Sequence, residues 1–374
     1  MSFASSKHPH PSATKLFPVP KFLVMPFASV DISEGALRAM KLERTSYGFR
    51  VEKYFEQMLP PETIVAGTIE KPGPLAEALR TIRREFKVQF VKASLPDEKT
   101  YLFRAEVPYV QGADLKESIE FLLEENVPLS PADSLFEYAV MPGTLPHERI
   151  PVIVSVVPKD VVSSYLSLLH SAGLVPLSFE IRSQALANSL LQRGDMRTTL
   201  LVHIGHSKTT LAVVEGGAVQ FSSVIAVGGT TLTSAVARAF SVSEQEAREM
   251  KEKKSFINTT SNQEFFSSLL NSVSVIKDEM RKVSLYWEDQ GNDSKGSPRK
   301  IERIVLSGKN SAVSGLREHI ALDMGKKVDI ANIWTNVASQ DIYIPPISYL
   351  QSLSFAPAVG LALPWPVSSQ MYHA

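Results

Sequence analysis

Cysteine is absent from this sequence of 374 residues. Its absence excludes disulfide bridges and thiolate metal sites, and it is compatible with a reducing compartment. The sequence also lacks an excess of charge of either sign, because 39 lysines and arginines balance 39 aspartates and glutamates. A neutral chain gives no electrostatic reason to expect nucleic acid or a broad anionic membrane surface as a partner.

Long uninterrupted apolar runs are lacking as well. The longest, residues 347–367, is broken by Pro357, Pro364 and Pro366, so it predicts a buried C-terminal helix and not a membrane span. Residues 1–20 are rich in proline, serine and histidine and have no apolar stretch like that of a signal peptide, which predicts a disordered tail. We therefore expect a soluble protein that reaches a membrane only through a partner.

The residues that are present fit an ordinary globular protein. Hydrophobic residues make up 44% of the chain and charged residues 21%, which is enough to bury a substantial core. The length favours two or three domains.

The stretch from Thr199 to Phe240 carries the first candidate binding site. An apolar strand pattern ends at Gly205, hydroxylated residues including Ser207 follow, and Gly216-Gly217 predicts a two-residue hairpin turn. A paired glycine, Gly228-Gly229, then precedes an amphipathic helix. A small turn lets backbone N–H groups approach an anion closely, and hydroxyl groups add donors. This stretch is therefore typical of a phosphate-binding cradle.

Two further turns at strand ends resemble this one. Residues Asp31–Gly35 link two strand patterns in the same way about half a chain earlier, which indicates a duplicated fold with facing loops. Ser307-Gly308 lies between the strand pattern 301–306 and the helix pattern 312–322, where the backbone can approach a ligand closely. We expect the three turns to converge on one cleft between two lobes.

The domain organisation follows from the order of the elements. Residues 21–109 form the first part of one lobe, and residues 110–178, with two helix patterns and several strands, predict a small inserted α/β subdomain. Residues 179–374 hold the rest of the first lobe and the second lobe. Within them Ser243 and Glu246 form a capping box that opens a helix, and residues 265–286 predict a long amphipathic helix whose stripe is either core or a partner surface.

The motifs occur in an order that resembles the type IV pilus assembly family PilM and, more distantly, the division protein FtsA. The resemblance covers nearly the whole chain after the tail. It rests on Val30-Asp31-Ile32, Gly67-Thr68-Ile69, Ala172-Gly173-Leu174, Ile204-Gly205-His206-Ser207, Val227-Gly228-Gly229, the stretch 246–251, the stretch 304–308, Gly315-Leu316 and the stretch 360–363.

The resemblance implies an actin-like, two-lobed α/β protein of the duplicated ribonuclease H-like type, closing over ATP and Mg²⁺. The residues that it places at the nucleotide are Asp31, Ser33, Gly35, Gly205, Ser207, Gly228, Gly229, Glu246, Gly308 and Lys309, with Asp31 as the candidate metal ligand. It also implies a scaffold at the inner membrane. Such a scaffold binds the short cytoplasmic tail of a PilN-like membrane protein in a groove near the insert and links it to the pilus motor ATPase. Self-association stays open, as does a related type II secretion machine.

Four residues depart from the family's nucleotide motifs. Ser33 replaces a glycine of the first loop, and Glu34 adds a carboxylate where phosphates would lie, which is repulsive. His203 replaces the aspartate that orders Mg²⁺ through water, and Lys309 replaces the second glycine of a pair, although its ammonium could contact phosphate. These departures predict weakened or lost ATP binding without hydrolysis.

Several alternatives remain at this stage. One is a kinase or ATPase of the same superfold, which would need intact phosphate loops and a positioned base; another is a division-type filament scaffold. Asp31 is either a cation ligand or a buried, hydrogen-bonded turn aspartate. His203 and His206 lack a third metal ligand, and Ser207 has no activating base. For Gly228-Gly229 we expect a structural turn that lies close to the other loops, whether or not a nucleotide is bound.

Overall fold

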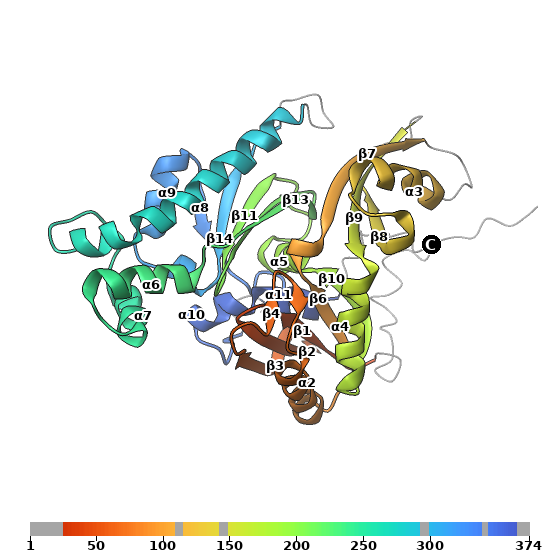
Figure 1. Cartoon of the computed structure of the whole chain (residues 1–374), viewed down its shortest axis with the longest axis horizontal. Coiled ribbons are helices and arrows are strands. Elements are labelled where there is room, and N and C mark those ends of the chain that lie inside the picture. Colours follow the sequence, from red (N-terminus) through yellow and green to blue (C-terminus); the bar gives the residue numbers. More distant parts are fainter. Residues whose placement is uncertain (1–24, 109–114, 142–148, 292–298, 339–342, 365–374) are drawn as a thin grey trace, which may run out of the picture.

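The computed structural model of the chain describes residues 25–108, 115–141, 149–291, 299–338 and 343–364. They form two lobes, each built on a five-stranded sheet, with a smaller three-stranded sheet beside them (Figure 1). The tail predicted for residues 1–20 lies outside the described residues.

The sheet of the first lobe has the strand order β10-β6-β1-β2-β3. Its strands are β1 (Phe27–Ile32), β2 (Ala36–Thr45), β3 (Gly48–Met58), β6 (Phe90–Leu95) and β10 (Val175–Ile181). Strands β1, β2 and β3 are antiparallel neighbours, whereas β1, β6 and β10 run parallel. The helices α2 (Pro72–Phe86) and α4 (Lys159–Ser171) pack their apolar side chains into the core of this lobe.

The sheet of the second lobe repeats this topology, with the order β13-β12-β11-β14-β15. Its strands are β11 (Thr199–Ile204), β12 (Thr209–Glu215), β13 (Ala218–Ile225), β14 (Arg303–Ser307) and β15 (Val328–Ile330). Again three antiparallel strands are followed by parallel pairings of β11 with β14 and of β14 with β15. The duplication inferred from the two similar turns is thus confirmed by the strand pairing, and the repeated topology agrees with the actin-like fold class that the resemblance implies.

Four helices belong to the second lobe: α6 (Gly229–Phe240), α7 (Glu244–Lys253), α8 (Gln263–Asp289) and α9 (Leu316–Met324). Helix α8 buries a stripe that includes Phe265, Leu269, Val273, Ile276, Met280 and Val283, all at most 2% exposed. Spacings of three and four residues bring these side chains onto one face of the helix. The stripe is core, so the alternative of a partner surface does not hold.

Two helices lie between the sheets. Helix α5 (Arg182–Leu190) and the short helix α11 (Ala356–Ala362) pack together in one apolar cluster with residues of β2 and β12. A Cβ at Gly360 would lie 1.8 Å from the carbonyl oxygen of Ala185, so this close packing requires glycine. The predicted C-terminal helix is present as α10 (Tyr349–Ser352) and α11, separated by a 3-10 turn at Leu353–Phe355. None of the helices within the described residues has the length and apolar character needed to span a membrane.

The inserted sheet has the order β7-β9-β8, with antiparallel pairing throughout. Its elements are β7 (Tyr101–Pro108), α3 (Leu115–Asn126), β8 (Ser134–Val140) and β9 (Arg149–Pro158). The sheet therefore begins before the expected residue 110. It also ends before residue 178, because α4 contributes Tyr165 and Leu169 to the first-lobe core and β10 pairs with β6. The segment that follows β9 has thus returned to the first lobe.

The remaining short elements connect these parts. They are β4 (Ile64–Val65), β5 (Thr68–Ile69) and the 3-10 turns η2 (Asp97–Lys99), η3 (Pro131–Asp133) and η4 (Lys309–Ala312).

Candidate functional site

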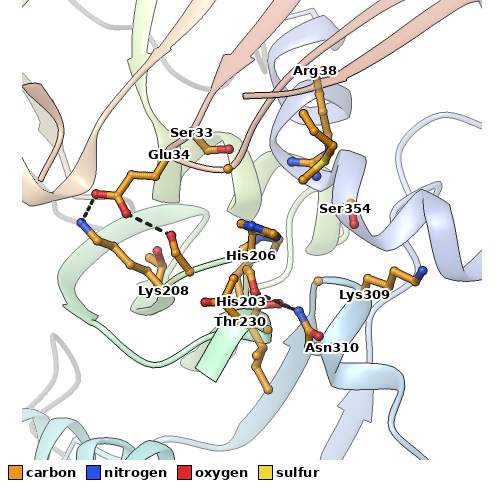
Figure 2. A pocket seen from close by; sticks show the side chains of 18 of the residues that line it. Ser33, Glu34, Arg38, His203, His206, Lys208, Thr230, Lys309, Asn310 and Ser354 are labelled. Carbon is orange, nitrogen blue, oxygen red and sulfur yellow. Dashed lines mark hydrogen bonds and ion pairs between the residues drawn. The ribbon is translucent and has the colours of Figure 1, made fainter. Parts of the chain in front are cut away.

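The three predicted turns line one cleft of about 650 Å³ between the lobes, as we expected. The first lobe contributes Ser33–Gly35, and the second lobe contributes Gly205–Lys208 and Gly308–Asn310. Figure 2 shows side chains from both lobes pointing toward one another across this cleft. The strand ends that carry the turns meet because β1 and β11 occupy equivalent positions in the two sheets.

Glu34 joins the two lobes across the cleft. Its carboxylate accepts hydrogen bonds from Ser207 Oγ at 3.0 Å and from the backbone N–H of Ala66 at 2.9 Å, and it lies 2.6 Å from Lys208 Nζ. Lys208 in turn contacts Glu98 Oε1 at 2.9 Å. We call Glu34, Glu98, Ser207 and Lys208 the interlobe clamp; its ion pair between Glu34 and Lys208 is drawn in Figure 2.

Glu34 and Lys208 of the clamp are charged at neutral pH. Burial alone would raise the pKa of Glu34, but hydrogen bonds from Lys208, Ser207 and Ala66 outweigh it and lower the pKa below the ordinary value. Burial would lower the pKa of Lys208, yet the two carboxylates beside it raise the pKa instead. The clamp is therefore an ion-paired contact and not a pair of neutral side chains.

The space beside Glu34 is also filled. A Cβ at Gly35 would lie only 2.3 Å from Cδ2 of His206, so the imidazole lies directly against the first turn. Ser33 closes its own turn, because its hydroxyl donates to the carbonyl oxygen of Ala36 at 2.7 Å. The Ser33 backbone N–H also donates to the carbonyl of Ala36, at 3.1 Å, so the first turn is closed on itself and offers the Glu34 carboxylate to the cleft.

Asp31 does not line the cleft. Its fully buried carboxylate accepts from Arg182 Nε at 2.9 Å and from Ser94 Oγ at 3.1 Å. The described residues contain no group of three or more His, Asp or Glu side chains placed to hold a metal ion. The geometry favours the buried turn aspartate among the two alternatives and gives no support to Asp31 as a metal ligand.

His203 lies at the floor of the cleft, at the end of β11. It is buried, and its Nδ1 is 2.9 Å from Ser307 Oγ on the neighbouring strand β14. Burial, followed by the charges of Arg182 and Arg38, lowers the pKa of His203 well below the usual value for histidine. The imidazole is therefore neutral at physiological pH and supplies no negative charge for ordering a hydrated cation.

The glycine pair Gly228-Gly229 holds the second-lobe turns together. Gly229 N donates to the Gly205 carbonyl at 3.0 Å, and the next N–H, that of Thr230, donates to the His206 carbonyl at 2.8 Å. A Cβ at Gly228 would lie 2.5 Å from the backbone nitrogen of Lys208. Gly229 lines the cleft, whereas Gly228 does not. The pair thus has the role of a structural turn, which is the role we expected from the sequence.

Lys251 and Asn310 form a polar network that was not predicted from the sequence. Lys251 Nζ donates to the Gly229 carbonyl and to Asn310 Oδ1, each at 3.1 Å, and Asn310 Nδ2 donates to the Gly205 carbonyl at 2.9 Å. Only 8% of Lys251 is exposed, and burial followed by the charges of Arg248 and Lys309 lowers its pKa to about 8. Lys251 follows the buried Ala247 by four residues, which places both side chains on the same face of the helix, and this spacing could have predicted that Lys251 is buried.

Lys309 and Glu246 both bind residues of the protein itself. Lys309 Nζ contacts Glu252 Oε1 at 2.7 Å, half exposed at the mouth of the cleft. Glu246 accepts from the backbone N–H of Ser243 at 2.9 Å, which confirms the capping box. Glu246 does not line the cleft, contrary to its expected place at the nucleotide, because the cleft-facing side of α7 carries Glu244, Arg248, Lys251 and Glu252.

One more charged side chain in the cleft was missed. Arg38 on β2 points into it from the first lobe (Figure 2) and pairs with Glu56 Oε1 at 2.7 Å. Its position within an alternating strand pattern gave no indication that it faces the other lobe.

Comparison with known proteins identifies related chains. A family model described as Type IV pilus assembly protein PilM matches residues 29–364. A solved structure of the "PilM-PilN type IV pilus biogenesis complex" has a TM-score of 0.71 and 22% identity, covering 90% of this chain and 98% of that chain. The ethanolamine utilization protein EutJ from Carboxydothermus hydrogenoformans has a TM-score of 0.53 and 14% identity, covering 92% of this chain and 91% of that chain. MreB5 of Spiroplasma citri bound to ADP has a TM-score of 0.53 and 12% identity, covering 83% of this chain and 93% of that chain.

Proposed function

This chain belongs to the type IV pilus assembly protein PilM family, and we propose that it serves a pilus machine as an actin-like scaffold with weakened or lost ATP binding. The interlobe clamp supports the proposal that ATP binding is weakened or lost. Its ion pair between Glu34 and Lys208 lies between the first- and second-lobe turns, where the phosphates of a nucleotide would bind.

Three features of the cleft oppose a polyphosphate. The Glu34 carboxylate repels phosphate oxygens unless a cation lies between them. Lys208, the cation nearest to Glu34, is already shared between Glu34 and Glu98. His203 is neutral and Asp31 is paired with Arg182, so neither is a ready ligand for Mg²⁺.

Calorimetric titration with ATP and Mg²⁺ tests this part of the proposal. We expect weak or undetectable binding and no release of phosphate. Micromolar or tighter binding with turnover would contradict it and would favour an ATPase or kinase of the same fold. Tight binding without turnover, together with polymerisation, would favour a filament scaffold.

We further propose that the partner is the cytoplasmic tail of a PilN-like inner-membrane protein, which holds this chain at the membrane and links it to the motor ATPase. One of the similar solved structures is a complex of PilM with PilN. In this chain, β10 is one edge strand of the first-lobe sheet and β8 is one edge strand of the insert. Unpaired strand edges can accept an extended peptide as an additional strand.

Exposed apolar side chains lie on both edges. Val175 and Leu177 of β10 are 37% and 41% exposed, and Leu135 of β8 is 45% exposed. These side chains could supply the apolar contacts that give a strand-adding peptide its specificity. A tail that binds there would contact the first lobe and the insert at once.

Titration of tail peptides from candidate inner-membrane proteins tests the docking site. Leu177→Glu should lower peptide affinity at least about tenfold, because it introduces a charge into an apolar contact. Val275→Glu, on the exposed side of α8 with 47% exposure, is the matched control and should leave the affinity unchanged. Equal loss in both variants would contradict docking at β10.

A further inference from the structure

Three arginine side chains surround a small hollow at the C-terminal end of α2. They are Arg80, Arg83 and Arg84, all exposed, and Ala172 after α4 completes the lining. We call this feature the arginine hollow.

The three guanidinium groups have no carboxylate partner among the described residues. Some exposed arginines elsewhere do have one: Arg50 pairs with Glu43, Arg197 with Asp195 and Arg248 with Glu244. The helix macrodipole accounts for cations in the last turn of α2, where Arg83 and Arg84 lie. The macrodipole does not explain why Arg80, one turn earlier, is also an arginine, or why the three side chains line the same hollow.

The backbone beside the hollow is shaped around one of the arginines. Gly173, which follows Ala172, has a φ of +72°, and a Cβ there would lie 2.7 Å from Arg83 Nη1. Any larger residue at position 173 would displace this guanidinium. Gly173 therefore lets the Arg83 guanidinium pack directly against the backbone at the edge of the hollow.

The hollow lies at the start of the β10 edge. Residues 172 and 173 lead directly into β10, and Val175 N donates to the carbonyl of Gln89 at 2.8 Å. The exposed apolar side chains of this edge, Val175 and Leu177, are those proposed above for the partner tail, so the hollow lies beside that docking site. Clustered basic side chains are typical of protein surfaces that contact anionic lipid headgroups.

We propose that the arginine hollow binds the phosphate headgroup of an anionic phospholipid. Guanidinium groups match the geometry of phosphate oxygens. A single hollow on a neutral chain fits one headgroup better than an extended nucleic acid backbone, which requires a continuous basic track. The choice of a lipid also rests on the proposed function, because a partner tail docked on β10 would turn this edge toward the membrane.

Vesicle co-sedimentation of the full chain, without any partner peptide, tests the proposal. We expect binding to phosphatidylcholine vesicles that contain phosphatidylglycerol, little binding to pure phosphatidylcholine, and weaker binding as salt is added. The triple variant R80Q/R83Q/R84Q should lower the partition constant on the order of a hundredfold, because each basic residue at an anionic surface contributes about fivefold.

The matched control is R44Q/R238Q/K282Q, which removes the same charge from exposed positions elsewhere. It should change the partition constant by less than about threefold, well short of the fivefold contributed by even one residue at the surface. Equal loss in both triple variants would overturn the hollow as a site, and so would absence of binding to the anionic vesicles. Binding of an acidic peptide to the hollow, with no binding to vesicles, would overturn the lipid assignment.

Each of the two proposals, peptide docking and lipid binding, can be contradicted without contradicting the other. The peptide titration described above is done in solution without vesicles, and the vesicle assay is done without peptide. Thermal unfolding of both triple variants verifies that lost binding is not lost folding.

Discussion

At the scale of single residues, the properties of the cleft depend on side chains that bind one another. Glu34, Lys208 and Asp31 are all of a type that could bind a ligand, yet each is already paired within the chain. Pairing of this kind lowers the free energy of the unliganded state, so a ligand must first break it. The substitutions that remove a pair are therefore the informative ones.

Replacement of Glu34 by glutamine should raise the affinity for MgATP about tenfold, the equivalent of ~1.4 kcal/mol. The change removes the negative charge that opposes phosphate and releases Lys208 from one of its two partners. Calorimetric titration of the variant and the original protein measures the effect. Glu62→Gln, which removes an exposed carboxylate paired with Lys71, serves as the control. Unchanged or weaker affinity in the Glu34 variant would contradict the role assigned to the clamp.

Asp97 should make stability depend on pH in a defined direction. Burial raises its pKa from the ordinary 3.8 to about 6, against the opposing effect of the hydrogen bond from the backbone N–H of Ser183. Between these two values the folded chain binds a proton that the unfolded chain has lost. This contribution to stability is complete below the unfolded pKa and is lost as the pH rises through the folded one.

Asp97→Asn removes that titration. The free energy of unfolding of the variant, compared with the original protein, should therefore increase as the pH rises from about 4 to about 7. Urea unfolding at a series of pH values measures the difference. Asp289→Asn, an exposed position, should give a constant difference. A constant difference for Asp97→Asn as well would show that burial does not shift this group.

At the scale of elements, the sequence predicted what local patterns can encode. The stripe of α8 and the capping box of α7 were predicted correctly because spacings of three and four residues specify them locally. The limits of the insert were predicted incorrectly. The amphipathic pattern of α4 shows that Tyr165 and Leu169 are buried, but it does not show whether they pack into the core of the insert or into that of the first lobe. Only strand pairing reveals that β10 belongs to the first lobe.

In the candidate site, too, features set by neighbouring residues could be predicted and contacts between residues far apart in the sequence could not. Convergence of the three turns could be predicted from the repeated strand-turn-strand pattern. The partners of the side chains could not, because Asp31 and Arg182 are 151 positions apart, and Glu34 and Ser207 are 173 apart. No short-range pattern connects such residues.

A substitution that creates a cavity in the core of the insert should destabilise the insert and leave the lobes stable. Leu123 of α3 is fully buried in a core formed by β7, β9 and α3. Leu123→Ala should destabilise this part by about 3 kcal/mol and raise hydrogen exchange within residues 101–158 while α4 and β10 stay protected. Leu79→Ala in the first-lobe core is the contrasting variant. Uniform loss of protection in the Leu123 variant would contradict a separate unit with these limits.

At the scale of the whole molecule, charged side chains connect the second lobe to the first lobe and to the insert. The interlobe clamp is one such contact. Another is made by Arg104 on β7, whose Nη1 is 3.3 Å from Glu215 Oε2 on β12 and whose guanidinium carbon is 5.8 Å from the centre of the Trp287 ring on α8. Movement of one lobe against the other would therefore displace the start of the insert.

A double-mutant cycle of Arg104→Met and Glu215→Gln should give a coupling energy of about 0.5–1 kcal/mol, typical of a partly exposed ion pair. Urea unfolding of the four proteins measures it. Arg248 and Glu244, an exposed pair within α7, provide the comparison and should couple more weakly. Additive effects at Arg104 and Glu215 would show that this contact does not connect the parts.

The interlobe clamp has a consequence for how such a protein would behave in solution. Glu34 and Lys208 belong to the same polypeptide, so folding of the chain is enough to bring them together. The strength of their ion pair falls as the ionic strength rises. The closeness of the two turns is thus a property of the folded chain in its solvent, and added salt should loosen it in the absence of any ligand.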